Sequence, residues 1–169
     1  MAYCRMLRQI IRERGAQSLV YLDESGFEAS TYRPYGWAPK GRPVYGERSG
    51  NTRPRTSLIV AQCGNQLLAP VLFQGATNAL WFNHWLKHCL FPQLPANATL
   101  IMDNATFHKT AQTRKIIEQS PYHLLYLPKY SPDLNRIEQV FANLKQRRQH
   151  APQGTSLDEL VRTYENYLV

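Results

Sequence analysis

Five short apolar runs along the chain have the length and composition of β-strands. They cover residues 18–22, 57–63, 67–73, 98–102 and 122–127. Gly64-Asn65-Gln66, between the second and third runs, predicts a tight antiparallel turn. The first and fourth runs stop at Asp23 and Asp103, so each of these strands is expected to carry an acid at its C-terminal end.

Apolar residues at helical spacing predict helices between and after these strands. The expected helices cover residues 3–15, 78–90, 110–119, 131–149 and a last stretch from 156. Three of them have start signals. Asn78 precedes the apolar residues of the second helix, Ser131 is an N-cap followed by Pro132, and Ser156 and Glu159 form a capping box. The apolar face expected for the second helix consists of Leu80, Trp81, Trp85, Leu86 and Leu90.

Three strands that pair antiparallel, followed by helices and strands in alternation, predict a mixed five-stranded sheet with helices on both faces. This α/β arrangement fits a ribonuclease H-like domain, and the element order alone leaves other α/β folds open. With 169 residues and 43% hydrophobic content, the chain is expected to form one domain. That domain is expected to cover residues 16–169, and the arginine-rich residues 1–15 are expected to be a basic helical linker.

The charge of the chain predicts a polyanionic partner. Twenty Lys and Arg against twelve Asp and Glu give a net charge of +8, for which nucleic acid is the leading candidate. The three cysteines are scattered without metal-site spacing; they are Cys4, Cys63 and Cys89. This pattern favours a reducing, cytoplasmic setting, in which we expect the protein to be associated with DNA. No apolar stretch is long enough to span a membrane, so we expect no membrane partner.

Two basic segments are candidates for contact with DNA phosphates. In residues 32–55, a long loop or irregular hairpin, aromatic residues alternate with basic ones; Trp37 fits a wedge against a base and a plug in the core equally well. The end of the helix expected over 131–149 is also basic, which suits phosphate contact and the helix dipole alike. The candidate cations are Arg33, Lys40, Arg42, Arg53, Arg55, Lys145, Arg147 and Arg148.

Asp23, Asp103 and Glu138 are the candidate catalytic acids. Phosphoryl transfer on DNA can use two divalent ions held by carboxylates that converge from separate elements. Glu138 is expected in the second turn of its helix, on the flank of a buried stripe that starts at Leu134. Each acid taken alone also fits a turn former or a solvated residue, so the spacing permits a metal site without establishing one.

The sequence around these acids is more specific than their spacing. The motifs are Asp23-Glu24-Ser25-Gly26-Phe27, Tyr35-Gly36-Trp37-Ala38-Pro39-Lys40-Gly41, Asp103-Asn104-Ala105 with His108, and Tyr130-Ser131-Pro132-Asp133-Leu134-Asn135 followed by Ile137-Glu138. In this order they resemble the DDE-superfamily transposases, in particular the mariner-related insertion-sequence branch. Thirty-four residues separate Asp103 from Glu138, which is the spacing of that branch. Arg136 departs from the pattern, since the branch more often has Pro there.

The resemblance implies a ribonuclease H-like fold and a metal-dependent endonuclease and strand transferase that uses Mg²⁺ or Mn²⁺. Such an enzyme hydrolyses DNA at the transposon ends, and the freed 3′-OH then attacks target DNA. Asp23, Asp103 and Glu138 match the metal-binding acids of the family. The resemblance also implies a dimer assembled on DNA. It further implies helix-turn-helix modules, which we do not find before the first strand and which an upstream reading frame could encode.

Several neighbouring residues have two readings. Asn104 and His108 are expected to orient the metal ligands or a bound water. Glu24 is expected at the surface, and Asn135 fits a helix cap or a DNA contact. His84 and His88 have a spacing that zinc can use, but without a third ligand a polar helix face is the better interpretation.

Two other functions stay open at this point. A nuclease that acts on RNA–DNA hybrids or branched DNA would share the fold and the acids. A degenerate remnant that binds DNA and regulates a full-length transposase would share the charge but not the chemistry, because phosphate contacts give affinity without cleavage.

Overall fold

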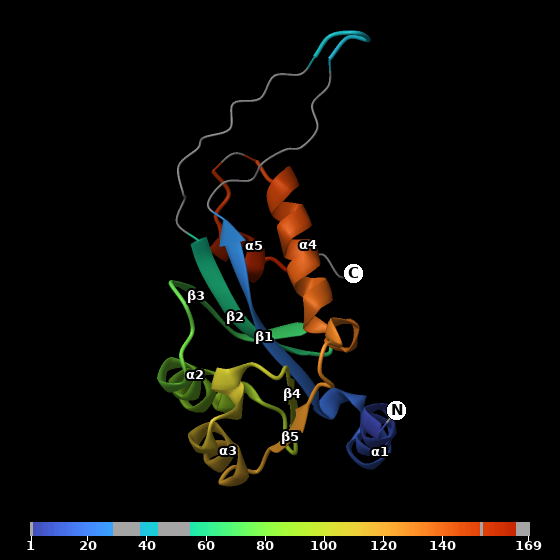
Figure 1. Cartoon of the computed structure of the whole chain (residues 1–169), viewed down its shortest axis with the longest axis vertical. Helices are drawn as coiled ribbons and strands as arrows, with labels where there is room; N and C mark the ends of the chain where they lie inside the picture. Colours follow the sequence, from blue (N-terminus) through green and yellow to red (C-terminus); the bar gives the residue numbers. More distant parts are fainter. Residues whose placement is uncertain (1, 29–37, 44–54, 153, 165–169) are drawn as a thin grey trace.

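The computed structural model describes residues 2–28, 38–43, 55–152 and 154–164, and Figure 1 shows their arrangement. Five strands form one sheet in the order β3-β2-β1-β4-β5. Both β1–β2 and β2–β3 pair antiparallel, whereas β1–β4 and β4–β5 pair parallel, so the expected mixed sheet is confirmed. The strands are β1 (Leu19–Glu28), β2 (Arg55–Cys63), β3 (Gln66–Gln74), β4 (Thr99–Met102) and β5 (His123–Tyr126).

The helices lie on both faces of this sheet, as expected. The α-helices are α1 (Ala2–Arg14), α2 (Ala79–Trp85), α3 (Ala111–Glu118), α4 (Ile137–His150) and α5 (Leu157–Arg162). One apolar cluster joins α1, α4 and α5 to the sheet, and a second cluster joins α2 and α3 to its other side. Short helical turns complete the fold: η1 (Ala16–Ser18), η2 (Leu86–Leu90), η3 (Phe91–Gln93), η4 (Thr106–Lys109) and η5 (Pro132–Leu134).

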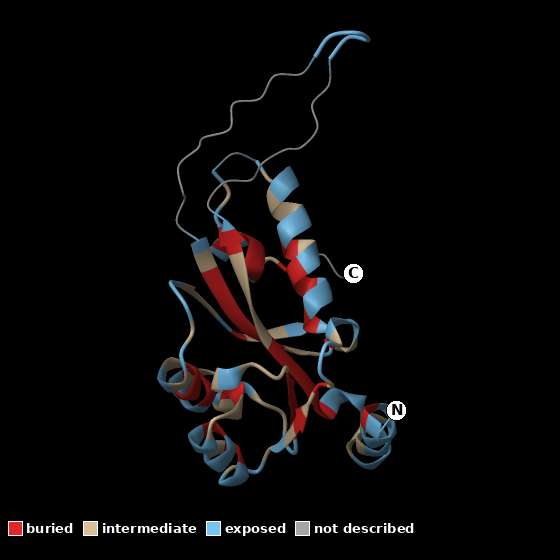
Figure 2. Cartoon of the chain, in the orientation of Figure 1, coloured by how far each residue is buried: buried red, intermediate tan, exposed pale blue. Residues whose placement is uncertain are grey.

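The central strand β1 supplies both clusters. Side chains alternate between the two faces of a strand, so Leu19 and Tyr21 pack into the first cluster while Val20 and Leu22 pack into the second. Figure 2 shows the resulting band of buried residues along the strands. This double burial explains why the first apolar run of the sequence is continuous rather than alternating.

The expectation that β1 ends at Asp23 was wrong. The strand continues to Glu28, and residues 23–28 pair with residues 55–60 of β2. The local sequence Asp-Glu-Ser-Gly favours a turn, but the backbone hydrogen bonds of an antiparallel partner outweigh this local preference. Asp23 is therefore held inside a ladder, whereas Asp103 directly follows the last residue of β4.

Two expected helices begin as their sequences indicate. The Asn78 side chain accepts a hydrogen bond from Trp81 N at the start of α2, and Ser156 accepts one from Glu159 N at the start of α5. The apolar face of α2 differs from the expected one, because Leu80 is 74% exposed and Phe82 is buried. Phe82, Trp85 and Leu86 have the three- and four-residue spacing of a helical stripe, and η2 then continues the chain as a π-helical turn.

The N-terminal segment forms the expected helix. Tyr3 is buried, and Leu7 and Ile10 pack against the same cluster as α4 and α5. The division of the chain into a linker over 1–15 and a domain from 16 remains a proposal. Of the helices in the described ranges, none is long and apolar enough to cross a bilayer.

Candidate active site

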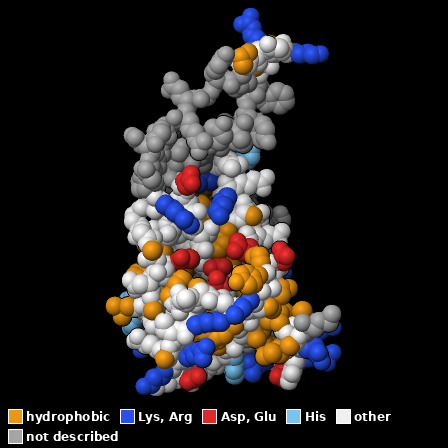
Figure 3. Space-filling view, in the orientation of Figure 1, with side chains coloured by type: hydrophobic (Ala, Val, Ile, Leu, Met, Phe, Trp, Pro, Cys, Tyr) orange, Lys and Arg blue, Asp and Glu red, His pale blue; other side chains and the backbone are white. Residues whose placement is uncertain are grey.

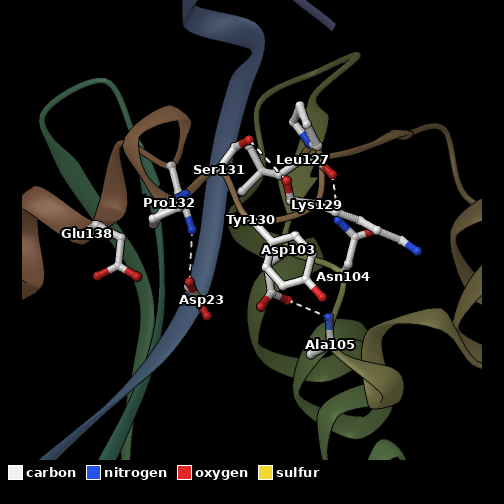
Figure 4. Close-up of a pocket in the computed structure, with 12 residues that line it drawn as sticks. Asp23, Asp103, Asn104, Ala105, Leu127, Lys129, Tyr130, Ser131, Pro132 and Glu138 are labelled. Carbon is white, nitrogen blue, oxygen red and sulfur yellow. Dashed lines mark hydrogen bonds between the residues drawn. The ribbon is translucent and has the colours of Figure 1, made fainter.

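The two aspartates are brought together by the register of β1 and β4. Leu19 pairs with Thr99 and Tyr21 with Ile101. The same parallel register, continued by two residues, sets Asp103 beside Asp23 at the end of β4. Both side chains line a hollow of about 480 Å³, which Figure 4 shows in close-up.

Asp23 is held by two donors. The Glu24 backbone N–H donates to its Oδ1 at 2.7 Å, and Asn135 Nδ2 donates to its Oδ2 at 2.8 Å. Burial raises the pKa of Asp23 to about 7; the Glu24 N–H opposes this, and the nearby acids Asp103, Glu138 and Glu24 add to it. In the metal-free protein, the surroundings of Asp23 therefore disfavour the ionised form of its carboxyl group.

Asp103 has the opposite pKa shift, although it stands beside Asp23. His108 Nδ1 lies 2.6 Å from its Oδ1, and the Ala105 backbone N–H donates to the same atom at 2.9 Å. These contacts, the histidine first, hold the pKa of Asp103 below its usual value against the effect of burial. An ionised carboxylate only accepts hydrogen bonds, so the His108 Nδ1 is the donor.

His108 is itself fixed by its packing. Its side chain is 1% exposed, its ring lies 4.5 Å from the Phe82 ring and 4.2 Å from that of Phe107, and its carbonyl accepts from the Tyr126 hydroxyl. The contact with Asp103 is consistent with the expectation that His108 orients a metal ligand, which stays a prediction. Asn104 lines the hollow and donates to the Leu127 carbonyl at 2.6 Å, so it links the end of β4 to the segment after β5.

Glu138 reaches the hollow from α4, and it lies in the first turn of that helix rather than the second. The expected continuous helix from Ser131 was wrong. Only the short turn η5 begins there; it ends at Leu134, and the next residue, Asn135, has an extended backbone with φ −94° and ψ 99°. Asn135 is 4% exposed, and the hydrogen bond that its side chain donates to Asp23 holds it away from the helical path. Ser131 donates to the Lys129 carbonyl and makes no cap.

The three acids share the hollow without forming a closed cluster. Glu138 is exposed, and within the described residues no group of three His, Cys, Asp or Glu side chains is close enough to hold a metal ion. In the same part of the chain, no Lys or Arg forms an ion pair with any of the three acids. Carboxylate oxygens are the ligands that Mg²⁺ and Mn²⁺ prefer, so the chemistry of the donor set fits such an ion.

The structure also shows contacts that the sequence did not reveal. The Asn135 amide joins α4 to Asp23, a role that neither of its two expected readings included. Glu24, expected at the surface, is partly buried and its Oε2 accepts from the Thr77 hydroxyl. Burial raises the pKa of Glu24 above its usual value. Side chains alternate between the two faces of β1, so Glu24 lies on the other face of the strand from Asp23. This alternation was the signal in the sequence for the partial burial of Glu24.

The candidate DNA-binding cations have different environments. Arg33, Trp37 and Arg53 lie outside the described residues, while Lys40, Arg42, Arg55 and Lys145 are exposed. Arg55 crosses Gly26 of β1, and the Lys145 ammonium lies 5.8 Å from the Phe27 ring, so both flank the far end of β1. In Figure 3, basic side chains lie above and below a group of acids on one face of the molecule.

Two of the helix α4 cations are less accessible. Arg147 is partly buried, and its guanidinium donates to the Thr163 hydroxyl at 3.1 Å. Arg148 is also partly buried, and burial lowers the pKa of its guanidinium from the usual value. Lys145 is therefore the member of this group that is most accessible to a phosphate.

The fold and the acidic hollow define a ribonuclease H-like domain with an acidic site formed by β1, the end of β4 and the start of α4. A family model described as DDE superfamily endonuclease matches residues 18–161. The match spans most of the chain, and the chain belongs to this family. The family inferred from the motifs and the fold class are thus confirmed, while the insertion-sequence branch remains a prediction.

Solved structures of mariner transposases are similar to the chain in fold. The Mos1 transposase paired-end complex with the left transposon end has a TM-score of 0.73 and 16% identity over 97% of this chain and 58% of that chain. The catalytic domain of Mos1 mariner transposase has a TM-score of 0.65 and 17% identity over 98% of this chain and 77% of that chain.

A third similar structure is the mariner Mos1 paired end complex with Mg, with a TM-score of 0.68 and 17% identity over 98% of this chain and 57% of that chain. The chain thus spans less than two thirds of the Mos1 chains in these paired-end complexes. At such identities the likeness establishes the fold. Among curated protein sequences, none matches the chain.

Proposed function

We propose that this chain is the catalytic part of a DNA transposase. It cleaves DNA strands at the ends of a mobile element and joins the freed 3′-OH to target DNA. The observation that carries the proposal is the β1–β4 register that sets Asp103 beside Asp23, in a chain of the DDE superfamily endonucleases. The similar solved structures include the Mos1 strand transfer complex, which supports DNA as the partner.

Asp23, Asp103 and Glu138 are proposed as the ligands of two divalent ions, Mg²⁺ or Mn²⁺. Bound ions of this kind polarise a phosphate and make a water or a DNA hydroxyl more acidic. The support in this chain is the oxygen donor set and the raised pKa of the buried Asp23 carboxyl, whose ionised form a bound cation would stabilise. The similar Mos1 structures with Mn and with Mg support the same choice of ion.

The residues around the acids have positioning roles in this proposal. His108 holds the Asp103 carboxylate ionised and in one orientation, and the hydrogen bond from Asn135 orients one oxygen of Asp23. Glu138 is exposed on the first turn of α4 and completes the site when the ions and DNA bind. Water and then a DNA 3′-OH are the nucleophiles, so no side chain of the protein forms a covalent intermediate.

The basic residues at the far end of β1 are proposed to hold the DNA backbone. Arg55 and Lys145 are exposed and flank this end of the strand, and Lys129 lines the hollow itself. Lys40 and Arg42 extend the same role, and Arg33, Trp37 and Arg53 remain predictions. Phosphate contacts of this kind give affinity without sequence choice.

The choice of DNA ends is proposed to come from another part. The chain spans 58% of the Mos1 chain in the paired-end complex, which leaves room for recognition modules outside the matched region. A helix-turn-helix part, encoded upstream or in a longer form of the protein, would supply them. Two copies of the catalytic part are proposed to assemble on paired ends.

The test combines metal binding with nicking. Mn²⁺ binding is measured by the loss of its free six-line electron paramagnetic resonance signal, and nicking by the relaxation of supercoiled plasmid in Mn²⁺. Asp103→Asn is expected to weaken Mn²⁺ binding and to reduce nicking at least a thousandfold. Asp158→Asn, in an exposed i,i+4 ion pair with Arg162, is the matched control and keeps both. Full nicking by Asp103→Asn contradicts the proposal.

The open position of Glu138 supports one alternative, a regulator that binds DNA without cutting it. This function needs the basic surface but no assembled acids. Metal-independent DNA binding, together with no nicking in Mg²⁺ or Mn²⁺ by the protein supplied with its recognition part, favours the regulator. Nicking that disappears in Glu138→Gln and persists in the matched α3 variant Glu118→Gln favours the transposase.

A further inference from the structure

Tyr130 is the most exposed large hydrophobic side chain among the described residues. Its relative exposure is 100%, and its backbone has φ +55°, in the left-handed region that aromatic residues rarely adopt. It lies in the segment between β5 and α4 and lines the same hollow as Asp23, Asp103 and Glu138, as Figure 4 shows. An aromatic ring in water on an unfavourable backbone contributes nothing to the core, so packing within the monomer gives no reason for it.

The surrounding contacts hold this backbone in place. Before Tyr130, the Leu127 carbonyl accepts from Asn104, and after it, Asn135 donates to Asp23. The Ser131 hydroxyl donates to the Lys129 carbonyl across Tyr130 itself. The segment is therefore tied at both ends to the strands that carry the acids, and the ring is presented at the rim of the hollow from a fixed base.

The chemistry of the rim points to a nucleic acid base as the partner of the ring. Lys129, adjacent in sequence, is exposed and lines the hollow, so it offers a phosphate contact beside the ring. An exposed aromatic next to a cation is the combination that binds unstacked bases, because every base has a face on which a ring can stack. A planar ring at the mouth of a site can also enter a base step and open it.

We propose that Tyr130 stacks on a DNA base next to the phosphate that enters the hollow. The tyrosine ring then occupies the position that the neighbouring base holds in an intact duplex. This inference rests on the proposed function, since it takes DNA as the molecule that reaches the acids. Tyr130 is a positioning residue: the ring fixes the register of the strand, so that one phosphate lies above Asp23 and Asp103.

The proposal is tested by binding rather than by cleavage. Competing mixed-sequence duplexes, one intact and one with an abasic nucleotide opposite a normal base, are bound in Ca²⁺. An abasic position removes the cost of unstacking and leaves a gap that the ring fills, so the wild-type chain is expected to prefer it about tenfold. Tyr130→Phe keeps the ring and the preference, and Tyr130→Ala binds both duplexes equally.

Two further variants separate the effect of the ring from folding and from general surface hydrophobicity. Tyr130→Gly suits the left-handed backbone and lacks the ring, so it loses the preference while its melting temperature stays at or above that of the wild type. Leu80→Ala removes another exposed side chain, on the first turn of α2, and keeps the preference. With both results, the choice between the duplexes depends on the ring itself.

Three results would overturn the proposal. The first is that Tyr130→Ala retains the preference for the abasic duplex. The second is that Tyr130→Phe loses this preference, because the hydroxyl is then the contact. The third is that the variants change self-association in sedimentation instead of the choice of DNA, because the ring then faces a second copy of the chain. A chain that prefers the abasic duplex but never nicks DNA supports the stacking role and contradicts the proposed transposase activity, so the two failures are distinguishable.

Discussion

The acids on the sheet and the acid on α4 are held by different parts of the fold. Asp23 and Asp103, the sheet half of the site, are set side by side by a strand register and fixed by four hydrogen bonds. Glu138, the helix half, follows an irregular segment and is exposed. One half is preorganised and the other is adjustable, which suits a site that must admit and release DNA strands.

The two carboxylates of the sheet half also differ from each other. Burial and neighbouring acids raise the pKa of Asp23 to about 7, whereas the hydrogen bond from His108 lowers that of Asp103. Asp103 is therefore ready to bind a cation at neutral pH, and Asp23 gains most from the arrival of one. We therefore expect substitutions of these carboxylates and of their hydrogen-bond partners to differ in the size of their effects.

The largest effect is expected from Asp23→Asn. Nicking in Mn²⁺ should fall by about a thousandfold or more, because a proposed ligand is lost. The metal-free variant should nevertheless be more stable than the wild type at pH 8, by about 2–4 kcal/mol, because the buried charge is removed. Urea unfolding in EDTA measures the free energy of unfolding, and plasmid relaxation measures the nicking.

The pH dependence has a defined sign. The folded pKa of Asp23 lies above its value in the unfolded chain, so the folded state keeps a proton that the unfolded state has lost between about pH 4 and 7. The stability of the wild type should fall as the pH rises through this window and level off above it. Mg²⁺ should reduce the slope, since it stabilises the ionised form. The control variant Asp158→Asn should keep this slope, and a slope that persists in Asp23→Asn would contradict the assignment.

A smaller effect is expected from His108→Gln, which weakens the anchoring of the sheet half. Mn²⁺ affinity and nicking should fall by about 10–100-fold, as for other contacts that orient a ligand. Loss of the hydrogen bond raises the pKa of Asp103, so the acid limb of the pH–rate profile should move to higher pH. His123→Gln, an exposed histidine on β5, is the control. An unchanged acid limb would mean that His108 serves packing alone.

Asn135→Ala tests the link between the halves. We expect about 1–3 kcal/mol of destabilisation, because a buried hydrogen bond to Asp23 is lost, and a roughly tenfold fall in nicking. Asn78→Ala, which removes the cap of α2 at a cost of about 1 kcal/mol, should leave nicking intact. If the two variants behave alike in both assays, Asn135 contributes to stability only.

The smallest effect is expected from a change in α5, a helix that shares an apolar cluster with α4. Ser156→Ala removes the N-cap of α5, which packs in the same cluster as α4, and should cost about 1 kcal/mol in urea unfolding. Nicking at a temperature well below unfolding should not change. A loss of nicking here would show that the position of α4 depends on α5 more closely than their shared apolar cluster implies.

Local patterns in the sequence predicted most of the fold. The apolar runs gave the strands and their order, and the Asn78 and Ser156 signals marked true helix starts, because caps and periodicities depend on residues a few positions apart. The strong signal at Ser131-Pro132 failed. The buried Asn135 that follows has its side chain hydrogen-bonded to Asp23, 112 residues away in sequence, and this distant contact interrupts the helix.

By itself, the sequence determined the element order, the mixed sheet and the family, because these depend on periodicity, on start signals and on motifs read along the chain. The tertiary structure decided how the acids are arranged. The extension of β1 to Glu28, the neighbourhood of Asp23 and Asp103, the His108 contact and the open position of Glu138 all follow from pairing and packing. These interactions join residues distant in sequence or depend on burial, which no local pattern encodes.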